Sequence, residues 1–235
     1  MDNLDILFEP LGLSLSSVQR EQFSDYYRLL IEWNKRINLT SITAEQEVAV
    51  KHFYDSITPS IYFPFSKGKK VCDVGSGAGF PGIPLKIVNP GIELTIVDSL
   101  QKRLAFLQAL VQKLELNHIS LIHERAETFA QQKSYREHFD IVVARAVAGL
   151  SVLSEYCLPL LRRGGLFIAM KGPNVENEIK QAGRAIQILG GSFRRQEKLE
   201  LPFGMGGRSL LVIEKTGLSP IKYPRKPGTP VRKPL

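Results

Sequence analysis

The chain has 235 residues, of which 43% are hydrophobic and 23% charged, and its formal net charge is +8 at pH 7. This composition is typical of a globular protein with one main domain, and the sequence holds no repeat or low-complexity tract. No apolar stretch reaches the roughly 18 residues that span a bilayer, and the N-terminus MDNLDILFEP is acidic where a signal peptide is basic. We therefore expect a cytoplasmic protein with no membrane partner.

The first predicted element is an amphipathic helix in the segment SSVQREQFSDYYRLLIEWNKRINL. Aromatic and aliphatic residues recur there at helical spacing from Phe23 to Ile37, and Ser16 and Gln19 are placed as a capping box. A second helical stretch follows at EQEVAVKHFYDSITPSIYF. Together these patterns predict an N-terminal helical extension over residues 1–65.

Strand and helix patterns alternate from residue 70 onward. The predicted strands are 71–74, 93–98, 118–124, 139–145 and 165–171. The predicted helices are about 82–88, 100–115 and 150–163. Such βαβ units predict a parallel sheet, whereas the last two strand-like runs, 191–201 and 207–215, are joined by the short loop PFGMG and predict an antiparallel hairpin. An α/β core over residues 66–216 with this ending resembles the Rossmann-like fold of S-adenosylmethionine (SAM) methyltransferases.

The cysteines give no sign of a metal site. Cys72 lies in a predicted strand and Cys157 in a predicted helix, and neither has metal-ligand spacing to the other or to the four histidines. We therefore predict that both cysteines are packing residues and that the protein has no metal site.

Residues 71–84 read VCDVGSGAGFPGIP, a strand followed by a glycine-rich loop. A P-loop requires Gly-Lys-Ser/Thr at its end, where this chain has Phe80-Pro81-Gly82. A dinucleotide-binding loop would place its third glycine at position 80, and Pro81 and Pro84 lack the N–H groups that hold an anion. The loop therefore favours a flat or cationic ligand over a phosphate.

The same loop matches the pattern of SAM methyltransferases, in which a strand leads into Asp-x-Gly-x-Gly-x-Gly. The matching residues are Asp73, Gly75, Gly77 and Gly79. SAM carries a positive sulfonium and no phosphate, so it needs close approach of the backbone but not a helix N-terminus. We expect SAM as the cofactor, and a tight turn that serves packing alone is the alternative.

Two acidic residues follow the next strands, at the edge where α/β sheets bind ligands. Asp98 ends the second strand and can accept both ribose hydroxyls, although NAD would also suit this spacing and Asp98 or Ser99 could be a helix N-cap. Ala126 and Glu127 follow the third strand, where this fold class lays the adenine. The alternative for Glu127 is a solvated acid at a helix start.

The fourth strand ends in Ala144-Arg145-Ala146-Val147. Enzymes of this fold that methylate exocyclic amines have Asp/Asn-Pro-Pro-Tyr/Phe here, and those that methylate C5 of pyrimidines have Pro-Cys. Neither signature is present, which predicts an acceptor atom that already owns a nucleophilic lone pair.

Segments along nearly the whole chain closely resemble the bacterial small-subunit ribosomal RNA guanine-N7 methyltransferases, also called the glucose-inhibited division protein B family. They are WNKRINLTS (33–41), HFYDS (52–56), DVGSGAGFPGIPL (73–85), VDSLQKR (97–103), RAETF (125–129), ARAVAGL (144–150), MKG (170–172), GRSLLVIEK (207–215) and the YPRKPGTP tail. The tail does not occur in every branch of the family.

The resemblance implies transfer of a methyl group from SAM to N7 of a guanine in 16S ribosomal RNA. It places the cofactor contacts on Gly75, Phe80, Ala126, Glu127 and Arg145, with Asp98 as a further candidate and Asp73 and Gly77 beside them in the loop. Phe80 can pack its ring against SAM, and Arg145 can pair with the methionine carboxylate or hydrogen-bond the guanine. The expected partner is 16S rRNA or the small-subunit particle, and the expected state is a monomer.

Residues for the RNA side are less sharply defined. Asn34 and Asn38 are four residues apart and are expected to share a helix face. His52 and Asp55 are three residues apart and nearly share a face. A His52–Asp55 pair can mean a base or a local hydrogen bond that fixes helix packing, and Lys171 ends a strand near the site. Because N7 of guanine bears no proton, we assign no catalytic base and treat Arg145, Lys171, His52 and Asp55 as positioning candidates.

Residues 217–235 form a basic, proline-rich tail. The stretch from residue 219 carries five cations and no acid, which is five of the eight net charges, and it also holds five prolines. We predict an extended arm that binds RNA electrostatically and whose deletion spares SAM affinity, with a solvated disordered end as the alternative.

Two other functions remain open at this stage. One is a SAM-dependent methyltransferase that acts on another RNA or on a small molecule. The net charge of +8 disfavours the small molecule as substrate. The other is a non-catalytic RNA-binding protein that retains the fold.

Overall fold

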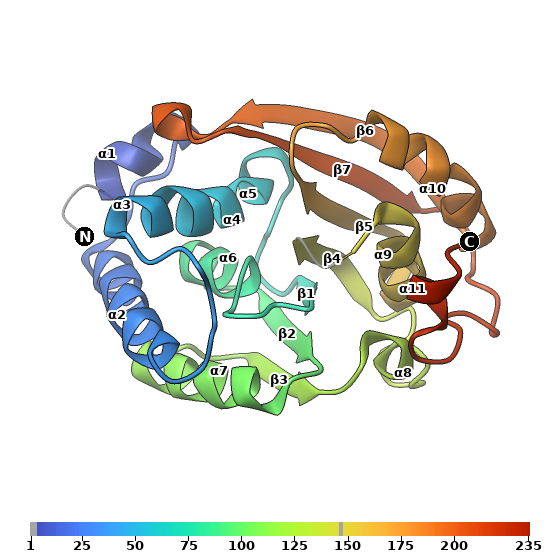
Figure 1. Ribbon diagram of the computed structural model, residues 1–235, viewed down its shortest axis with the longest axis horizontal. Coiled ribbons are helices and arrows are strands. Elements are labelled where there is room, and N and C mark those ends of the chain that lie inside the picture. Colours follow the sequence, from blue (N-terminus) through green and yellow to red (C-terminus); the bar gives the residue numbers. More distant parts are fainter. Residues whose placement is uncertain (1–3, 146–147) are drawn as a thin grey trace.

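The computed structural model describes residues 4–145 and 148–235 (Figure 1). Ala146 and Val147, the second half of the fourth-strand motif, lie outside the described residues. Within the described ranges no helix is both long and apolar enough to cross a membrane.

A seven-stranded sheet forms the centre of the molecule, in the order β3-β2-β1-β4-β5-β7-β6. The strands are β1 (Lys70–Val74), β2 (Glu93–Asp98), β3 (Ile119–His123), β4 (Phe139–Arg145), β5 (Leu161–Lys171), β6 (Gly191–Glu200) and β7 (Gly207–Lys215). The pairs among β1 to β5 are parallel, whereas β7 is antiparallel to both β5 and β6. The prediction of a mostly parallel sheet with a C-terminal antiparallel hairpin is confirmed.

Helices cover both faces of this sheet, as Figure 1 shows. The α-helices are α1 (Leu4–Phe8), α2 (Ser17–Asn34), α3 (Glu45–Glu47), α4 (Asp55–Ile57), α5 (Pro59–Tyr62), α6 (Gly82–Val88), α7 (Gln101–Lys113), α8 (Ala126–Phe129), α9 (Leu150–Cys157), α10 (Glu176–Ile188) and α11 (Thr229–Arg232). A π-helix (Val48–Tyr54) joins α3 to α4, and 3₁₀ turns lie at Glu9–Leu11, Leu158–Leu160 and Pro202–Gly204.

Alternate residues of the strands face two separate hydrophobic cores. In β4, Ile141 and Val143 pack in one core, while Val142 and Ala144 pack in the other. This is the two-residue period of a strand that is covered on both faces. Cys72 and Cys157 are both buried in the second core as free thiols, which fits their prediction as packing residues.

The N-terminal helices share the first core with the sheet. Phe23, Tyr26 and Phe53 are fully buried in the same cluster as residues of β1 and α6. The predicted capping box is present, because the Ser16 hydroxyl accepts from the Gln19 N–H and the Gln19 side chain accepts from the Ser16 N–H. The helical segment therefore supports the sheet edge at which a ligand would bind.

Several predicted element limits are wrong. The helix predicted over 150–163 ends at Cys157, because Pro159 places a 3₁₀ turn there and β5 begins at Leu161. Helix α10 was not predicted from the sequence at all. Helix α2 ends at Asn34, so Asn34 and the exposed Asn38 share no helix face.

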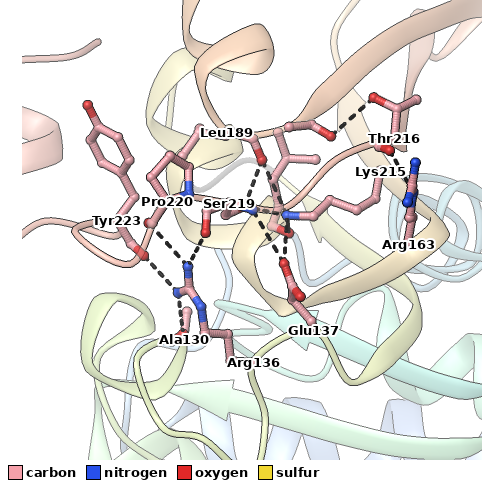
Figure 2. A network of polar contacts seen from close by, with 12 residues as sticks. Ala130, Arg136, Glu137, Arg163, Leu189, Lys215, Thr216, Ser219, Pro220 and Tyr223 are labelled. Atoms are coloured by element: carbon pink, nitrogen blue, oxygen red, sulfur yellow. Dashed lines mark hydrogen bonds and ion pairs between the residues drawn. The ribbon is translucent and has the colours of Figure 1, made fainter.

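The tail is folded onto the core and is not the extended arm that its prolines predicted. Figure 2 shows its first residues held by two side chains of the core: Arg136 donates to the carbonyl oxygens of Ser219 and Tyr223, each at 2.8 Å, and Lys215 reaches the Ser219 hydroxyl. The four residues Thr229–Arg232 even form the short helix α11, because Pro230 stands in its first turn, where a missing N–H costs nothing.

Candidate functional site

A cavity of about 570 Å³ opens at the carboxyl ends of β1, β2 and β4. Strand β1 lies between β2 and β4 in the sheet, so the chain order reverses beside it. Open α/β sheets bind ligands at such a switch point, and this volume lies in the range of small-molecule sites. The cavity is therefore the candidate ligand site.

The glycine loop forms the floor of the cavity because its backbone takes conformations that favour glycine. Gly75, Gly77 and Gly79 have φ angles of 75°, 62° and 97°. A Cβ on Gly79 would lie 2.6 Å from the Tyr26 hydroxyl oxygen, which itself donates to the carbonyl of Ala78. The loop is thus braced from behind by helix α2.

Asp73 braces the loop from below and does not line the cavity. Its carboxylate is fully buried and accepts a hydrogen bond of 2.7 Å from the Gly82 N–H. Burial raises the pKa of Asp73 to about 7, against the lowering effect of the nearby Ser76 hydroxyl and of the hydrogen bond from Gly82. Asp73, which was predicted among the cofactor residues, therefore supports the loop from within the core.

Asp98 lines the cavity and is held in place by backbone N–H groups. Its oxygens accept from Gly77 N–H at 3.0 Å and from Leu100 N–H at 2.9 Å, and Arg103 lies 3.4 Å away. Leu100, not Asp98 or Ser99, is the N-cap residue of α7. The predicted alternative of a helix cap is therefore wrong, and the Asp98 carboxylate is oriented toward the ligand space.

Glu127 and its neighbour Ala126, which follow β3 in the chain, also line the cavity. Its side chain is buried rather than solvated, and Oε1 accepts from the Gly228 N–H at 2.8 Å and the Tyr156 hydroxyl at 3.3 Å. Burial and the nearby Glu127 charge raise the pKa of Tyr156, which keeps its hydroxyl a donor. The alternative of a solvated acid at the start of a helix is not what the structure shows.

Arg145 joins the end of β4 to the N-terminal helices. Its Nη1 donates to Asp55 Oδ2 at 3.0 Å and to the Lys51 carbonyl at 3.1 Å, and its Nη2 lies 3.3 Å from His52 Nδ1. Asp55 is buried and also lies 3.3 Å from Arg208 Nε. The predicted positioning residues Arg145, His52 and Asp55 are thus brought together, with Arg145 between the other two.

His52 is neutral and its proton position follows from its partners. Burial, followed by the Arg145 charge, lowers its pKa to about 3. Since Arg145 donates to Nδ1, the proton lies on Nε2, which is 2.8 Å from Thr40 Oγ1. Neither ring nitrogen is free to take a proton from a substrate, so His52 positions Arg145.

Phe80 lines the cavity within a stack of protein side chains. Its ring stacks with those of Tyr26 and His52 at centroid distances of 5.3 and 4.5 Å, and the Arg145 guanidinium lies 4.9 Å from its centroid. Phe80 is only 5% exposed. Its predicted role against SAM is therefore limited to the small part of the ring that reaches the cavity.

The other RNA-side candidates have structural partners. Lys171 donates to the Ala148 carbonyl and to Glu178, whose carboxylate also accepts from the Leu150 N–H, so Lys171 fixes the segment after β4. The Asn34 side chain accepts from Leu39 and Thr40 N–H groups and shapes the turn after α2.

The cavity lining includes residues that the sequence analysis does not single out, among them Arg103, Tyr156, Gly228 and Val231. Arg103 stands in the quoted VDSLQKR motif at a spacing that could have shown its pairing with Asp98. Tyr156 lies two helix turns into α9, and Gly228 and Val231 belong to the tail, where nothing in the sequence indicates contact with the cavity.

The sheet and its cavity define a Rossmann-like methyltransferase fold. A solved SAM-dependent O-methyltransferase from Thermotoga maritima is similar, with a TM-score of 0.56 and 14% identity over 81% of this chain and 73% of that chain. At that identity the likeness shows the fold alone.

Sequence comparison is more specific. Residues 19–202 match the GidB family model, which is described as rRNA small subunit methyltransferase G. Relatives from Bacillus cereus and Bacillus thuringiensis, both named ribosomal RNA small subunit methyltransferase G, are each 52% identical over 235 residues, covering 100% of this chain and 98% of theirs. The chain belongs to the GidB family, as its sequence segments indicated.

Proposed function

We propose that this protein transfers a methyl group from SAM to N7 of a guanine in 16S ribosomal RNA. The observation that carries the proposal is the cavity itself, whose lining combines the glycine loop, the acidic residues Asp98 and Glu127, and Arg145 at the switch point of a methyltransferase fold. Membership of the GidB family supports ribosomal RNA as the substrate.

The donor set of the cavity fits SAM. Asp98 keeps lone pairs for ribose hydroxyls, because its partners among the described residues are two N–H groups and Arg103. We place the adenine beside Ala126 and Glu127. Arg145 has N–H groups left for a carboxylate or a base edge beyond its three protein contacts. When bound, SAM supplies an electrophilic methyl group on a sulfonium.

The chain's own contribution is to position the guanine. N7 has a free lone pair and no proton, and His52, the histidine of the cavity, is neutral with both nitrogens engaged. Holding two reactants in line at near-attack distance can contribute roughly 7 to 11 kcal/mol. The guanine must be unpaired or displaced from its stack, since N7 in an A-form helix lies in a groove too narrow for side chains.

Mass spectrometry of rRNA from a strain that lacks the gene tests this proposal. We expect one N7-methylguanosine of the 16S rRNA to disappear in the deletion strain and to return when the gene is restored. An unchanged set of methylated guanosines would contradict the substrate assignment.

We expect the rate of methyl transfer not to depend on pH through the titration of a general base. The pKa of His52 of about 3 keeps this ring neutral at every pH near 7. We predict a single-turnover rate, with RNA and SAM saturating, that is nearly flat with pH around neutrality and has a solvent deuterium isotope effect close to one. His52→Ala should change RNA affinity or folding more than this rate.

A rate that climbs tenfold per pH unit through neutrality in the wild type, and loses that dependence in His52→Ala, would show a base at work.

The lowered pKa of His52 also predicts how the stability of the folded state changes with pH. An unfolded chain protonates His52 below about 6.5 but the folded chain only near 3, so the folded state should lose stability as the pH falls from 6.5 toward 3.

The tail is expected to contribute electrostatic contacts to RNA although it is folded. Lys222, Lys226, Arg232 and Lys233 are exposed, whereas Arg225 is paired with Glu155. Each phosphate neutralised releases counterions, so replacing the four exposed cations by alanine should reduce the slope of log affinity against log salt by up to about four. An unchanged slope in a filter-binding titration would mean that the tail does not touch RNA.

A further inference from the structure

Two residues of the tail line the cavity. Gly228 and Val231 face the ligand space together with Glu127 and Tyr156, although the tail follows Glu127 by about a hundred positions in the chain. The Gly228 N–H donates to Glu127 Oε1 at 2.8 Å. This contact ties the tail to the side of the cavity where SAM's adenine is proposed to lie.

Buried contacts that precede Gly228 fix the course of the tail. Arg136 donates to the backbone carbonyls of Ser219 and Tyr223, Lys215 contacts the Ser219 hydroxyl (Figure 2), and Gln131 donates to the Pro224 carbonyl at 2.8 Å. Arg225 then pairs with the buried Glu155 through its guanidinium at 2.6 Å and also donates its backbone N–H at 2.8 Å. These anchors lie outside the cavity and leave residues 227–235 as the part that reaches it.

Gly228 can make this contact because its backbone adopts a conformation that favours glycine. Its φ of 79° lies in the left-handed region, and the residue stands directly before α11. Within the described part of the chain, Tyr156 and Gly228 donate to Glu127, so one of the two groups that orient this carboxylate comes from the tail.

We propose that residues 228–231 are the outer wall of the adenosine end of the cofactor site, and that Gly228 positions Glu127 for cofactor binding. This inference rests on the proposed use of SAM. It reverses the expectation from the sequence, under which deletion of the tail spares SAM affinity, because that expectation assumed an arm in solvent.

Truncation after Lys226 tests the wall with the anchors retained. This variant keeps the Arg225–Glu155 pair and the contacts of Figure 2, and it removes Gly228 and Val231. Losing one hydrogen bond and one apolar contact should weaken binding of SAM, S-adenosylhomocysteine and methylthioadenosine roughly tenfold each in titration calorimetry. The matched control is Arg232→Ala with Lys233→Ala, which removes the same two cations, keeps the wall and should bind SAM as the wild type does.

Steady-state kinetics separate a wall from a general loss of structure. The KM for SAM should rise roughly tenfold in the truncated protein, while the rate at saturating SAM stays within about twofold, because a poorly folded enzyme would lose kcat instead. Val231→Ala provides a second variant in the full chain, since Val231 is 61% exposed and its truncation spares the core. We expect about threefold weaker SAM binding from it.

The inference is overturned if the truncated protein binds SAM as tightly as the full chain, or if the double alanine control loses as much affinity as the truncation. If the truncated chain does not melt cooperatively, Val231→Ala decides, and unchanged SAM affinity in that variant overturns the wall. Absence of SAM binding by the wild type would instead overturn the proposed function.

Discussion

Replacing Gly75 by valine is expected to weaken SAM binding by at least about a hundredfold and to lower global stability by the backbone strain that valine meets at this position. Gly75 lines the cavity and has a φ of 75°, a conformation that costs a β-branched residue roughly 1 to 3 kcal/mol. The valine would either distort the loop or place an isopropyl group beside the ligand. Calorimetric titration with SAM and with S-adenosylhomocysteine measures the effect.

Gly68→Val is the matched control for backbone strain. Gly68 has a similar φ of 79°, has open space around a new Cβ and does not line the cavity. It should lose a comparable amount of stability and retain SAM affinity. Wild-type protein that binds NAD more tightly than SAM would contradict the assignment of the loop, as would a Gly75→Val variant that still binds SAM normally.

Replacing Arg145 by alanine is expected to lower the free energy of unfolding by about 3 kcal/mol and kcat/KM by at least about a hundredfold. The variant loses all three contacts from β4 to the N-terminal helices and leaves the buried Asp55 carboxylate to Arg208 alone. It also removes a cation from the cavity lining. Urea denaturation followed by circular dichroism gives the first quantity, and methyl transfer at limiting substrate gives the second.

Two further variants show why Arg145 matters. Arg145→Lys keeps the charge but not the planar fork, so it should fall between wild type and alanine in stability. Adding Asp55→Asn to Arg145→Ala removes the buried charge and should recover part of the lost stability. An Arg145→Ala protein as stable and active as the wild type would show that the junction with the N-terminal helices is unimportant.

The sequence predicted those parts of the fold that depend on local pattern. Strand β4 alternates between two cores and helix α2 has its capping box, and both are readable from residue spacing. The glycine loop was readable because positive φ angles require glycine at Gly75 and Gly77. The predicted limits of an element are wrong where a single residue changes the course of the chain, as Pro159 does after α9.

Long-range partners could not be predicted in the same way. Glu127 was found from its place after β3, but its donors come from α9 and from the tail, which only the folded chain brings together. The five prolines of the tail favour an extended arm, yet Arg225 is anchored by the buried Glu155 and Pro230 stands in the first turn of a helix. Local propensity carries no information about such anchors.

Methyl transfer from SAM to 16S rRNA can be followed with purified components. Purified protein is incubated with methyl-labelled SAM and with 16S rRNA from a strain that lacks the gene, either as naked RNA or within small-subunit particles. The RNA is then treated with borohydride and aniline, which cleave the chain at N7-methylguanosine. The account predicts incorporation of label and one new cleavage site in the 16S rRNA, whereas labelled RNA that resists cleavage, or no incorporation into either substrate, would contradict it.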